Sequence, residues 1–130
     1  MADIPLVSQV MIPDFKLIDG ITRVSEALAM MKKEGVHALL IRPRNPSDVH
    51  GIMTLRDIAR KVIAQRRHLH ETHVYEIMSK PVLSVSANMP VPYAARILTN
   101  FKVSYAMVLS DDKVVGLVSL NGMVTQWEGN

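Results

Sequence analysis

A hydroxyl and a carboxylate three residues apart are the side chains best placed for binding chemistry. The segment Gly51–Asp57 begins with glycine, continues with two apolar residues that fit a strand, and then carries Thr54 and Asp57. It recurs in weakened form at Gly116–Gly122, where Ser119 supplies the hydroxyl and a glycine replaces the carboxylate. The segment has the form of a ligand-contacting turn, so this difference between the two copies is the sharpest functional signal in the sequence.

Length and composition indicate a globular protein with a real core. The 130 residues are 48% hydrophobic and 21% charged, which is too apolar for a disordered chain. The absence of cysteine excludes disulfides, thiol nucleophiles and cysteine-ligated zinc. No apolar run approaches the roughly 18 residues of a transmembrane helix, and the first residues lack the pattern of a secretion signal. We therefore expect a soluble, cytoplasmic protein without a membrane partner.

The formal net charge of +3 is concentrated in the first half of the chain. Seven cations cluster there: Arg42, Arg44, Arg56, Arg60, Lys61, Arg66 and Arg67. Such a cluster suits phosphate on a small molecule or a nucleic-acid backbone, and a solvated helix face with a polar loop explains it equally well. A duplex-binding protein is usually more uniformly basic, so a nucleic-acid partner is the weaker expectation.

The chain contains an internal duplication that extends beyond the motif. Val7–Met11 matches Val74–Met78, and further apolar positions recur in step with them. We expect one copy at residues 4–66, a linker at 67–73 and a second copy at 74–130. Units of about 60 residues bury little surface alone, so the copies should pack on each other.

Each copy predicts a strand, a helix, two strands and a second helix, a mixed α/β class. Thr22 is a plausible N-cap for the first helix, and Pro90 suits the start of its counterpart. The predicted strands and turns are Lys16–Ile18, Ala38–Ile41, a loop at Arg42–Asp48 and His50–Met53, then Val82–Val85, Ala106–Leu109, a hairpin at Ser110–Lys113 and Val114–Val118.

This duplicated order resembles the cystathionine-β-synthase (CBS) domain in tandem, called a Bateman module. The resemblance covers about residues 4–128 and rests on Val74–Pro81, Glu26–Leu28 and Gly51–Asp57. It implies two β-α-β-β-α units packed with pseudo-twofold symmetry around two clefts. In the family these clefts commonly take AMP, ADP, ATP or S-adenosylmethionine. The resemblance also implies a regulatory role toward a partner protein, here an unknown effector, and no catalysis.

On this resemblance, Asp57 would accept hydrogen bonds from both ribose hydroxyls and Thr54 would bind the first phosphate. The alternative for Asp57 is a helix-start carboxylate favoured by the helix dipole. Further residues would complete the site in the cleft between the copies: Ile52, Arg56, Lys80, Pro81, Val82, Leu83, Ser104 and Tyr105.

The roles expected for these residues follow from their chemistry. Ile52, Pro81 and Val82 would form an apolar wall for adenine, while Lys80 and Arg56, with Arg60, would neutralise phosphate. Tyr105 could stack on a base or donate its hydroxyl, or it could be ordinary packing.

The second cleft would combine Ser119 with Phe15, Lys16 and His37, in a region that also includes Asp14, Ala38 and Gly122. Because Gly122 offers no carboxylate, charge-assisted hydrogen bonds of about 1.5–3 kcal/mol are lost, which weakens binding roughly 10- to 100-fold. We expect one competent site and one weak or empty site.

Two further features bear on metals and catalysis. His68, His70 and His73 could supply metal ligands, but they lie in the expected linker without a helical i, i+4 pair, so we predict a solvated linker and no metal. No motif for a nucleophile elbow, a metalloprotease helix or a phosphate loop is present, so we expect no enzyme and no catalytic cofactor.

Apolar residues on the helices that follow the two motifs predict a homodimer contact. A short final helix cannot bury a tryptophan alone, so it should pack on the other copy or on a second chain. The expected contact residues are Ile58, Val62, Met123, Val124 and Trp127. Two alternatives to the sensor remain: a ligand-free dimerisation module, and a nucleic-acid-binding module that uses the Arg42–Arg67 cluster.

Overall fold

The computed structural model describes residues 3–127, which form two compact units. The middle unit is Lys16–Val82, and the terminal unit joins Met1–Phe15 to Leu83–Asn130 as far as these are described. These compact units divide the chain differently from the expected sequence copies at residues 4–66 and 74–130, which stay a prediction. The segment that opens each sequence copy belongs to the unit that contains the sheet of the other copy.

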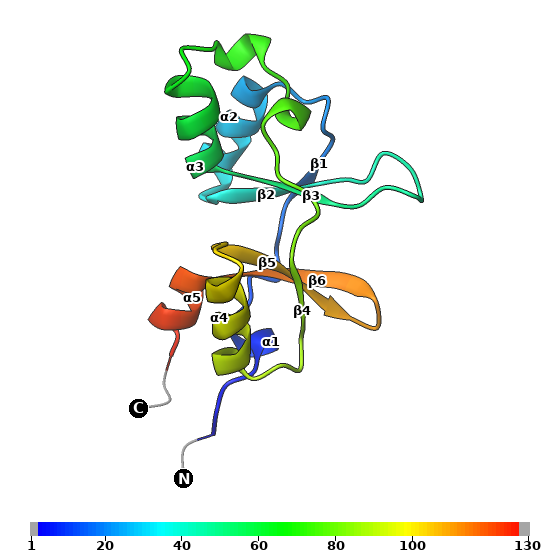
Figure 1. The fold of residues 1–130 in the computed structure, drawn as a ribbon, viewed down its shortest axis with the longest axis vertical. Helices are drawn as coiled ribbons and strands as arrows, with labels where there is room; N and C mark the ends of the chain where they lie inside the picture. The colour runs from blue at the N-terminus through cyan, green and yellow to red at the C-terminus, as the bar shows by residue number, and fades with distance from the viewer. Residues whose placement is uncertain (1–2, 128–130) are drawn as a thin grey trace. The chain divides into compact units, whose positions relative to one another are not determined.

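The middle unit is a three-stranded sheet covered by helices (Figure 1). Strand β2 lies at the centre, parallel to β1 and antiparallel to β3. The elements are β1 (Leu17–Ile18), α2 (Val24–Glu34), β2 (Ala38–Ile41), β3 (Gly51–Thr54), α3 (Leu55–Ile58), a π-helical turn (Ala59–Ile63) and two 3₁₀ turns (Leu69–Glu71 and Val74–Glu76).

The terminal unit repeats this plan with β5 at the centre of its sheet, parallel to β4 and antiparallel to β6. Its elements are α1 (Val7–Val10), β4 (Ser84–Ser86), α4 (Val91–Asn100), β5 (Tyr105–Ser110), β6 (Lys113–Ser119) and α5 (Leu120–Thr125). Asp111 and Asp112 both adopt positive φ, as a tight two-residue hairpin requires. The predicted mixed α/β class and the duplicated β-α-β-β-α order are confirmed.

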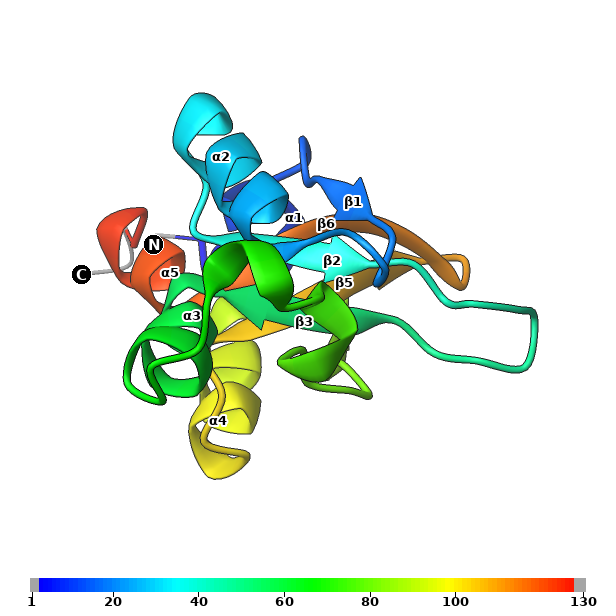
Figure 2. The ribbon, with the colours of Figure 1, turned by 90° about the horizontal axis from the view of Figure 1, so that it is seen from above.

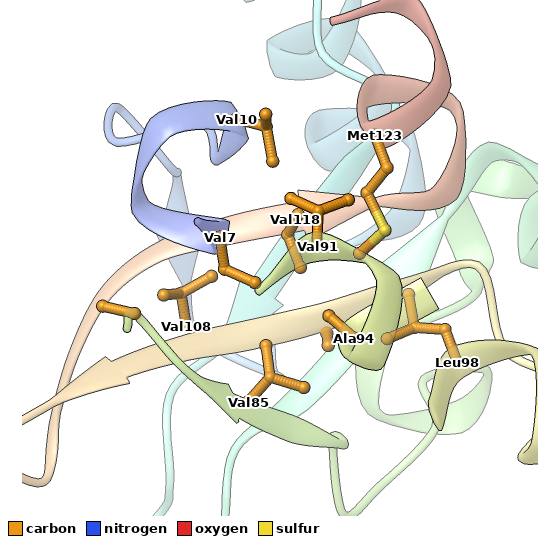
Figure 3. Close-up of a cluster of buried hydrophobic side chains, with 11 residues drawn as sticks. Val7, Val10, Val85, Val91, Ala94, Leu98, Val108, Val118 and Met123 are labelled. Atoms are coloured by element: carbon orange, nitrogen blue, oxygen red, sulfur yellow. The ribbon is translucent and has the colours of Figure 1, made fainter. Parts of the chain in front are cut away.

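Each unit has its own hydrophobic core. In the terminal unit, Val91, Ala94 and Leu98 recur at helical spacing on α4 and face the sheet residues Val108 and Val118. Figure 3 shows α1 contributing to the same cluster, through its two buried valines Val7 and Val10. The core of the middle unit brings α2, α3 and the π-helical turn onto β1, β2 and β3: Ile18, Val24, Ala27, Met31, Leu39, Ile41, Met53, Ile58, Val62, Val74 and Ile77.

The chain segments that open the copies pack against the motif strands at glycine. In the middle unit, a Cβ at Gly51 would lie 2.8 Å from Met78 Sδ. In the terminal unit, a Cβ at Gly116 would lie 2.7 Å from Met11 Sδ and 2.9 Å from the Ile12 carbonyl oxygen. Glycine fits at both positions because other atoms occupy the space of a side chain. At Gly51 the nearest atom belongs to a methionine side chain, and at Gly116 a methionine and a backbone carbonyl oxygen both lie there.

The predicted solvated linker at 67–73 is wrong in part, because this segment completes the start of α2. Thr72 is 1% exposed, and its carbonyl oxygen accepts the Val24 N–H at 2.8 Å. The N-cap of α2 is Arg23, which makes no side-chain capping bond, so the predicted cap at Thr22 is also wrong. A backbone carbonyl from the linker satisfies the helix N–H in its place.

The predicted dimer contact is wrong for three of its five residues. Ile58, Val62 and Met123 are at most 3% exposed and belong to the cores of their own units. Trp127 is half-buried and packs against the terminal core, so the final helix does cover part of it within its own unit. Val124 is 74% exposed and remains available. Helical spacing identified the apolar stripe but could not tell a core face from a contact face.

Within residues 3–127, no helix combines the length and the apolar character needed to cross a bilayer.

Candidate functional site at the motif helix

Thr54 and Asp57 join the end of β3 to the start of α3 through a reciprocal capping box. The Thr54 N–H and hydroxyl donate to Asp57 Oδ2 at 2.9 and 3.1 Å, and the Asp57 N–H donates back to Thr54 Oγ1 at 3.2 Å. The predicted placement of the hydroxyl at a strand end and the carboxylate in the next helical turn is confirmed. The sequence folds this way because each side chain satisfies a backbone N–H that the helix leaves unpaired.

The second carboxylate oxygen of Asp57 faces a cation. Lys61 Nζ lies 3.5 Å from Asp57 Oδ1 and also donates to the Ile77 carbonyl oxygen at 2.9 Å. Asp57 therefore does act as a helix-start carboxylate, and its Oδ1 can still accept hydrogen bonds. An ionised carboxylate has about four lone-pair positions, of which the box uses two on Oδ2. The hydroxyl of Thr54, with one hydrogen, must release Asp57 before it can donate to a phosphate.

The corresponding turn in the terminal unit is half of a capping box. Ser119 Oγ accepts the Gly122 N–H at 2.9 Å, and no carboxylate returns the bond because residue 122 is glycine. At the end of α5, Gln126 Nε2 donates to the Val10 carbonyl oxygen at 3.1 Å. The second site predicted at Ser119 draws its other residues from both units: Phe15 belongs to the terminal unit, and Lys16 and His37 belong to the middle unit. That site stays a prediction.

The residues predicted to complete the first site are divided between the two units. The middle unit, which contains Thr54 and Asp57, also holds five of them: Ile52, Arg56, Lys80, Pro81 and Val82. The terminal unit holds the other three: Leu83, Ser104 and Tyr105. Arg56 is exposed and, among the described residues, forms no ion pair.

Each central strand begins beside the motif of its own unit. The His37 carbonyl oxygen accepts the Leu55 N–H at 3.1 Å, and the Ser104 carbonyl oxygen accepts the Leu120 N–H at 3.0 Å. Tyr105 pairs with Ser119 across β5 and β6, and burial raises the pKa of its phenol. The phenol therefore keeps its proton, and can donate a hydrogen bond, at neutral pH. The predicted contacts of Ser104 and Tyr105 with the Thr54 site stay predictions.

Lys80 is engaged at the opposite end of β3 from Thr54. Its ammonium contacts both oxygens of Asp48 at 3.0 and 3.1 Å, and the Arg44 N–H donates to the same carboxylate at 2.9 Å. These bonds, led by the Arg44 N–H and followed by Lys80, hold the pKa of Asp48 far below its usual range. Sequence reasoning missed Asp48 as the partner of Lys80 because 32 residues separate them.

The basic cluster is largely paired within the middle unit. Acidic side chains bind four of its seven cations: Arg42 with Asp19, Arg44 with Asp48, Lys61 with Asp57 and Arg67 with Glu76. The His73 N–H, followed by Arg67, lowers the pKa of Glu76 and keeps it ionised. These pairs reduce the positive charge offered to a nucleic-acid backbone. Across residues 3–127, no three histidine or acidic side chains are grouped to hold a metal ion.

Each of the two sequence copies matches a known domain family. The CBS domain model matches this chain twice, over residues 7–64 and 74–126. The chain belongs to the CBS domain family. The CBS chain is 30% identical over 104 residues to the mitochondrial CBS domain-containing protein CBSX3 of Arabidopsis thaliana, which covers 78% of this chain and 50% of that protein. It is 27% identical over 107 residues to CBS domain-containing protein YhcV of Bacillus subtilis, covering 82% and 74%. The CBS chain thus spans about half of the Arabidopsis relative.

Solved CBS structures share the whole fold. A hexameric CBS-CP12 protein from bloom-forming cyanobacteria matches with a TM-score of 0.92 and 27% identity, covering 98% of this chain and 75% of that one. The CBS domain pair of protein MJ0100, in complex with 5′-methylthioadenosine and S-adenosyl-L-methionine, matches with a TM-score of 0.80 and 26% identity over 95% of both chains. The predicted membership and the tandem arrangement are confirmed.

Proposed function

We propose that this CBS domain pair binds an adenosine-containing ligand, one of AMP, ADP, ATP or S-adenosylmethionine, and signals its occupancy to a partner protein. The observation that carries the proposal is the turn at Thr54 and Asp57, where the carboxylate is only partly used by the capping box. The adenosyl ligands of the MJ0100 domain pair, a structural neighbour over nearly the whole chain, support this class of ligand.

Binding would proceed by exchange of hydrogen bonds at the turn. The ribose diol would donate to Asp57 Oδ1, where Lys61 now lies at 3.5 Å. The Thr54 hydroxyl would turn from Asp57 Oδ2 to a phosphate oxygen, while the two backbone bonds of the box would remain. The proposed site is completed by eight further residues: Ile52, Arg56, Lys80, Pro81, Val82, Leu83, Ser104 and Tyr105.

The signal would start at Lys61. This ammonium touches both Asp57 and the Ile77 carbonyl oxygen, so it joins the motif helix to the segment that follows the 3₁₀ turn Val74–Glu76. A ligand that competes for Asp57 would weaken this link. A ligand can shift the protein between a state with the Lys61–Asp57 contact and a state without it only if it binds one of them more tightly. A ligand that competes for Asp57 would bind the state without the contact more tightly.

The substitution Asp57→Asn is expected to weaken the tightest-binding adenosyl ligand by about 10- to 100-fold, because hydrogen bonds to an ionised group are lost. The fold should survive, since an amide oxygen still accepts the Thr54 N–H and the capping loss stays below about 1 kcal/mol. Isothermal titration calorimetry with each of the four ligands measures the effect.

The matched control is Glu76→Gln, which alters another capping-box carboxylate of the same unit. It should leave ligand affinity unchanged. Unchanged affinity in Asp57→Asn would contradict the proposal, as would the absence of binding below about 1 mM for all four ligands. In the second case, no nucleotide would stabilise the protein in a thermal-shift assay, which favours a ligand-free dimerisation module.

Self-association is proposed through the helix after the second motif. Val124 is 74% exposed on α5, more than Leu55 or Ile63 after the first motif. The hexameric state of the cyanobacterial CBS-CP12 protein supports association between copies. We expect Val124→Glu to weaken the dimer at least about 10-fold, since a charge would replace a buried apolar contact. Sedimentation velocity over a concentration series measures this.

The control for self-association is Phe101→Glu, which places the same charge at an apolar residue 66% exposed at the end of α4. It should leave the dimer intact. A monomeric wild-type protein, or a dimer that Val124→Glu does not weaken, would rule out this contact.

A further inference from the structure

A pocket of about 570 Å³ lies within the middle unit, separate from the motif turn. Its wall includes the end of β1, the end of β2 and the connection that leads toward β3. Ile41, which lines it, pairs with Gly51, whereas Thr54 pairs with Ala38 at the other end of these strands. Three residues of extended chain separate the two ends by about 10 Å. The pocket therefore does not belong to the site at Thr54 and Asp57.

One wall of the pocket is cationic. Arg42, Arg44 and Lys80 all line it, and Figure 2 shows the β2–β3 connection that carries the two arginines reaching away from the sheet. Asp48 holds Lys80 and the Arg44 backbone, and so orders this connection. Two carboxylates, Asp19 and Asp48, face three cations, which leaves one positive charge in excess.

The two arginines are able to exchange partners. Arg42 and Asp19 are 49% and 63% exposed, and the Arg44 side chain is 79% exposed. Ion pairs at such exposed positions contribute little to stability, so an anion can displace them. A guanidinium group can bind a phosphate through two parallel hydrogen bonds, whereas Arg42 and Arg44 each contact one carboxylate oxygen at 3.2 and 3.4 Å.

Another part of the lining is apolar and open to solvent. Ile21 is 77% exposed and Tyr75 is 53% exposed, and both line the pocket. The Tyr75 ring is stacked on His73, with centroids 5.4 Å apart, so it is held in place. A fixed aromatic ring beside an exposed isoleucine offers a face on which a second ring can stack. The core of the middle unit uses neither side chain.

We propose that this pocket is a second ligand site, which binds a small aromatic phosphate ester. The phosphate is held by Arg42 and Arg44, and the aromatic ring lies on Tyr75 and Ile21. The pocket volume is in the range of small-molecule sites and accommodates a ligand of mononucleotide size. Lys80 lines this pocket and is also among the residues proposed for the adenosyl site. The phosphate proposed here is held by Arg42 and Arg44, so this site does not require the adenosyl site.

The test is an NMR titration of the full chain with phenyl phosphate, and separately with inorganic phosphate. Phenyl phosphate should shift the amides of Gly20, Arg42 and Tyr75 saturably and bind about 10-fold more tightly than inorganic phosphate, since the ring adds its contact with Tyr75. Arg42→Ala and Arg44→Ala should each weaken phenyl phosphate about 10-fold. Tyr75→Ala, and independently Ile21→Ser, should reduce its advantage over inorganic phosphate.

Matched controls come from the terminal unit. Tyr93 is 56% exposed with the Arg96 guanidinium 5.7 Å from its ring centre, and Tyr93→Ala or Arg96→Ala should change nothing. Asp57→Asn should leave phenyl phosphate binding intact, and Arg42→Ala should leave adenosyl binding intact, which separates failure of this site from failure of the other. Shifts centred on Thr54, no saturable shift, or equal binding of inorganic phosphate would overturn the proposal. Tighter binding of a phosphotyrosine peptide than of phenyl phosphate would also overturn it, in favour of a phosphorylated protein segment.

Discussion

Val7→Asp is expected to unfold the terminal unit, and Val74→Asp is expected to unfold the middle unit. Both valines are fully buried, Val7 in the core with Val108 and Val118, and Val74 in the core with Ile18. A carboxylate at either position has no buried partner, so we expect each substitution to cost its unit more than about 4 kcal/mol. This is the largest effect that we expect of a single substitution.

Hydrogen–deuterium exchange with mass spectrometry distinguishes the two units. Val7→Asp should accelerate exchange in β5 and β6, and Val74→Asp should accelerate it in β2 and β3. The exposed neighbours provide controls, because Ser8→Asp and Tyr75→Asp place the same charge one residue away in solvent. Loss of protection in β2 and β3 after Val7→Asp would contradict the assignment of the Val7 segment to the terminal unit. The compact units would then coincide with the sequence copies.

Gly116→Ala is expected to destabilise the protein by about 2–4 kcal/mol, and Gly51→Ala by no more than about 1 kcal/mol. At Gly116 the new methyl group would meet the Ile12 carbonyl oxygen at 2.9 Å, and the Ile12–Leu117 backbone pair cannot move without losing its hydrogen bonds. At Gly51 the close contact is the flexible Met78 sulfur, with the Ser79 carbonyl oxygen at 3.4 Å. A gain of about 0.4–1 kcal/mol from the less flexible unfolded chain offsets part of either cost.

Urea unfolding monitored by circular dichroism measures both changes. The controls are double variants that remove the methionine. Met78→Ala should abolish the extra cost of alanine at residue 51, whereas Met11→Ala should recover only part of the cost at residue 116, because the Ile12 carbonyl oxygen remains. Equal destabilisation at the two glycines would show that the backbone contact at Ile12 does not matter.

The order of elements could be predicted because local signals agree with the fold. The helical spacing on α4, the prolines at its start and the Asp111–Asp112 turn each act within a few residues of the chain. The capping box had a local signal as well, since Thr54 and Asp57 are three residues apart. The caps of α2 were different. Its first N–H is satisfied by Thr72, far along the chain, which no local pattern reveals.

The chemistry of the motif turn could be predicted, but the pairing of its charges could not. A hydroxyl and a carboxylate at this spacing indicated a binding turn, and the loss of the carboxylate at Gly122 indicated an unequal second copy. Lys80 and Asp48 meet only because two distant segments reach the same end of the sheet. The dimer contact could not be predicted for a similar reason. An apolar stripe such as the one with Met123 has the same sequence pattern whether it packs on its own core or on another chain.

The sequence by itself determined that this protein is a duplicated α/β chain with one complete and one incomplete motif, Thr54 with Asp57 and Ser119 with Gly122. These features depend on residue type and short spacing. Only the tertiary structure decided which sheet each opening segment joins. Val7–Met11 and Val74–Met78 carry apolar residues at matching positions, so the sequence alone does not assign them, and the choice depends on contacts between residues far apart in the chain.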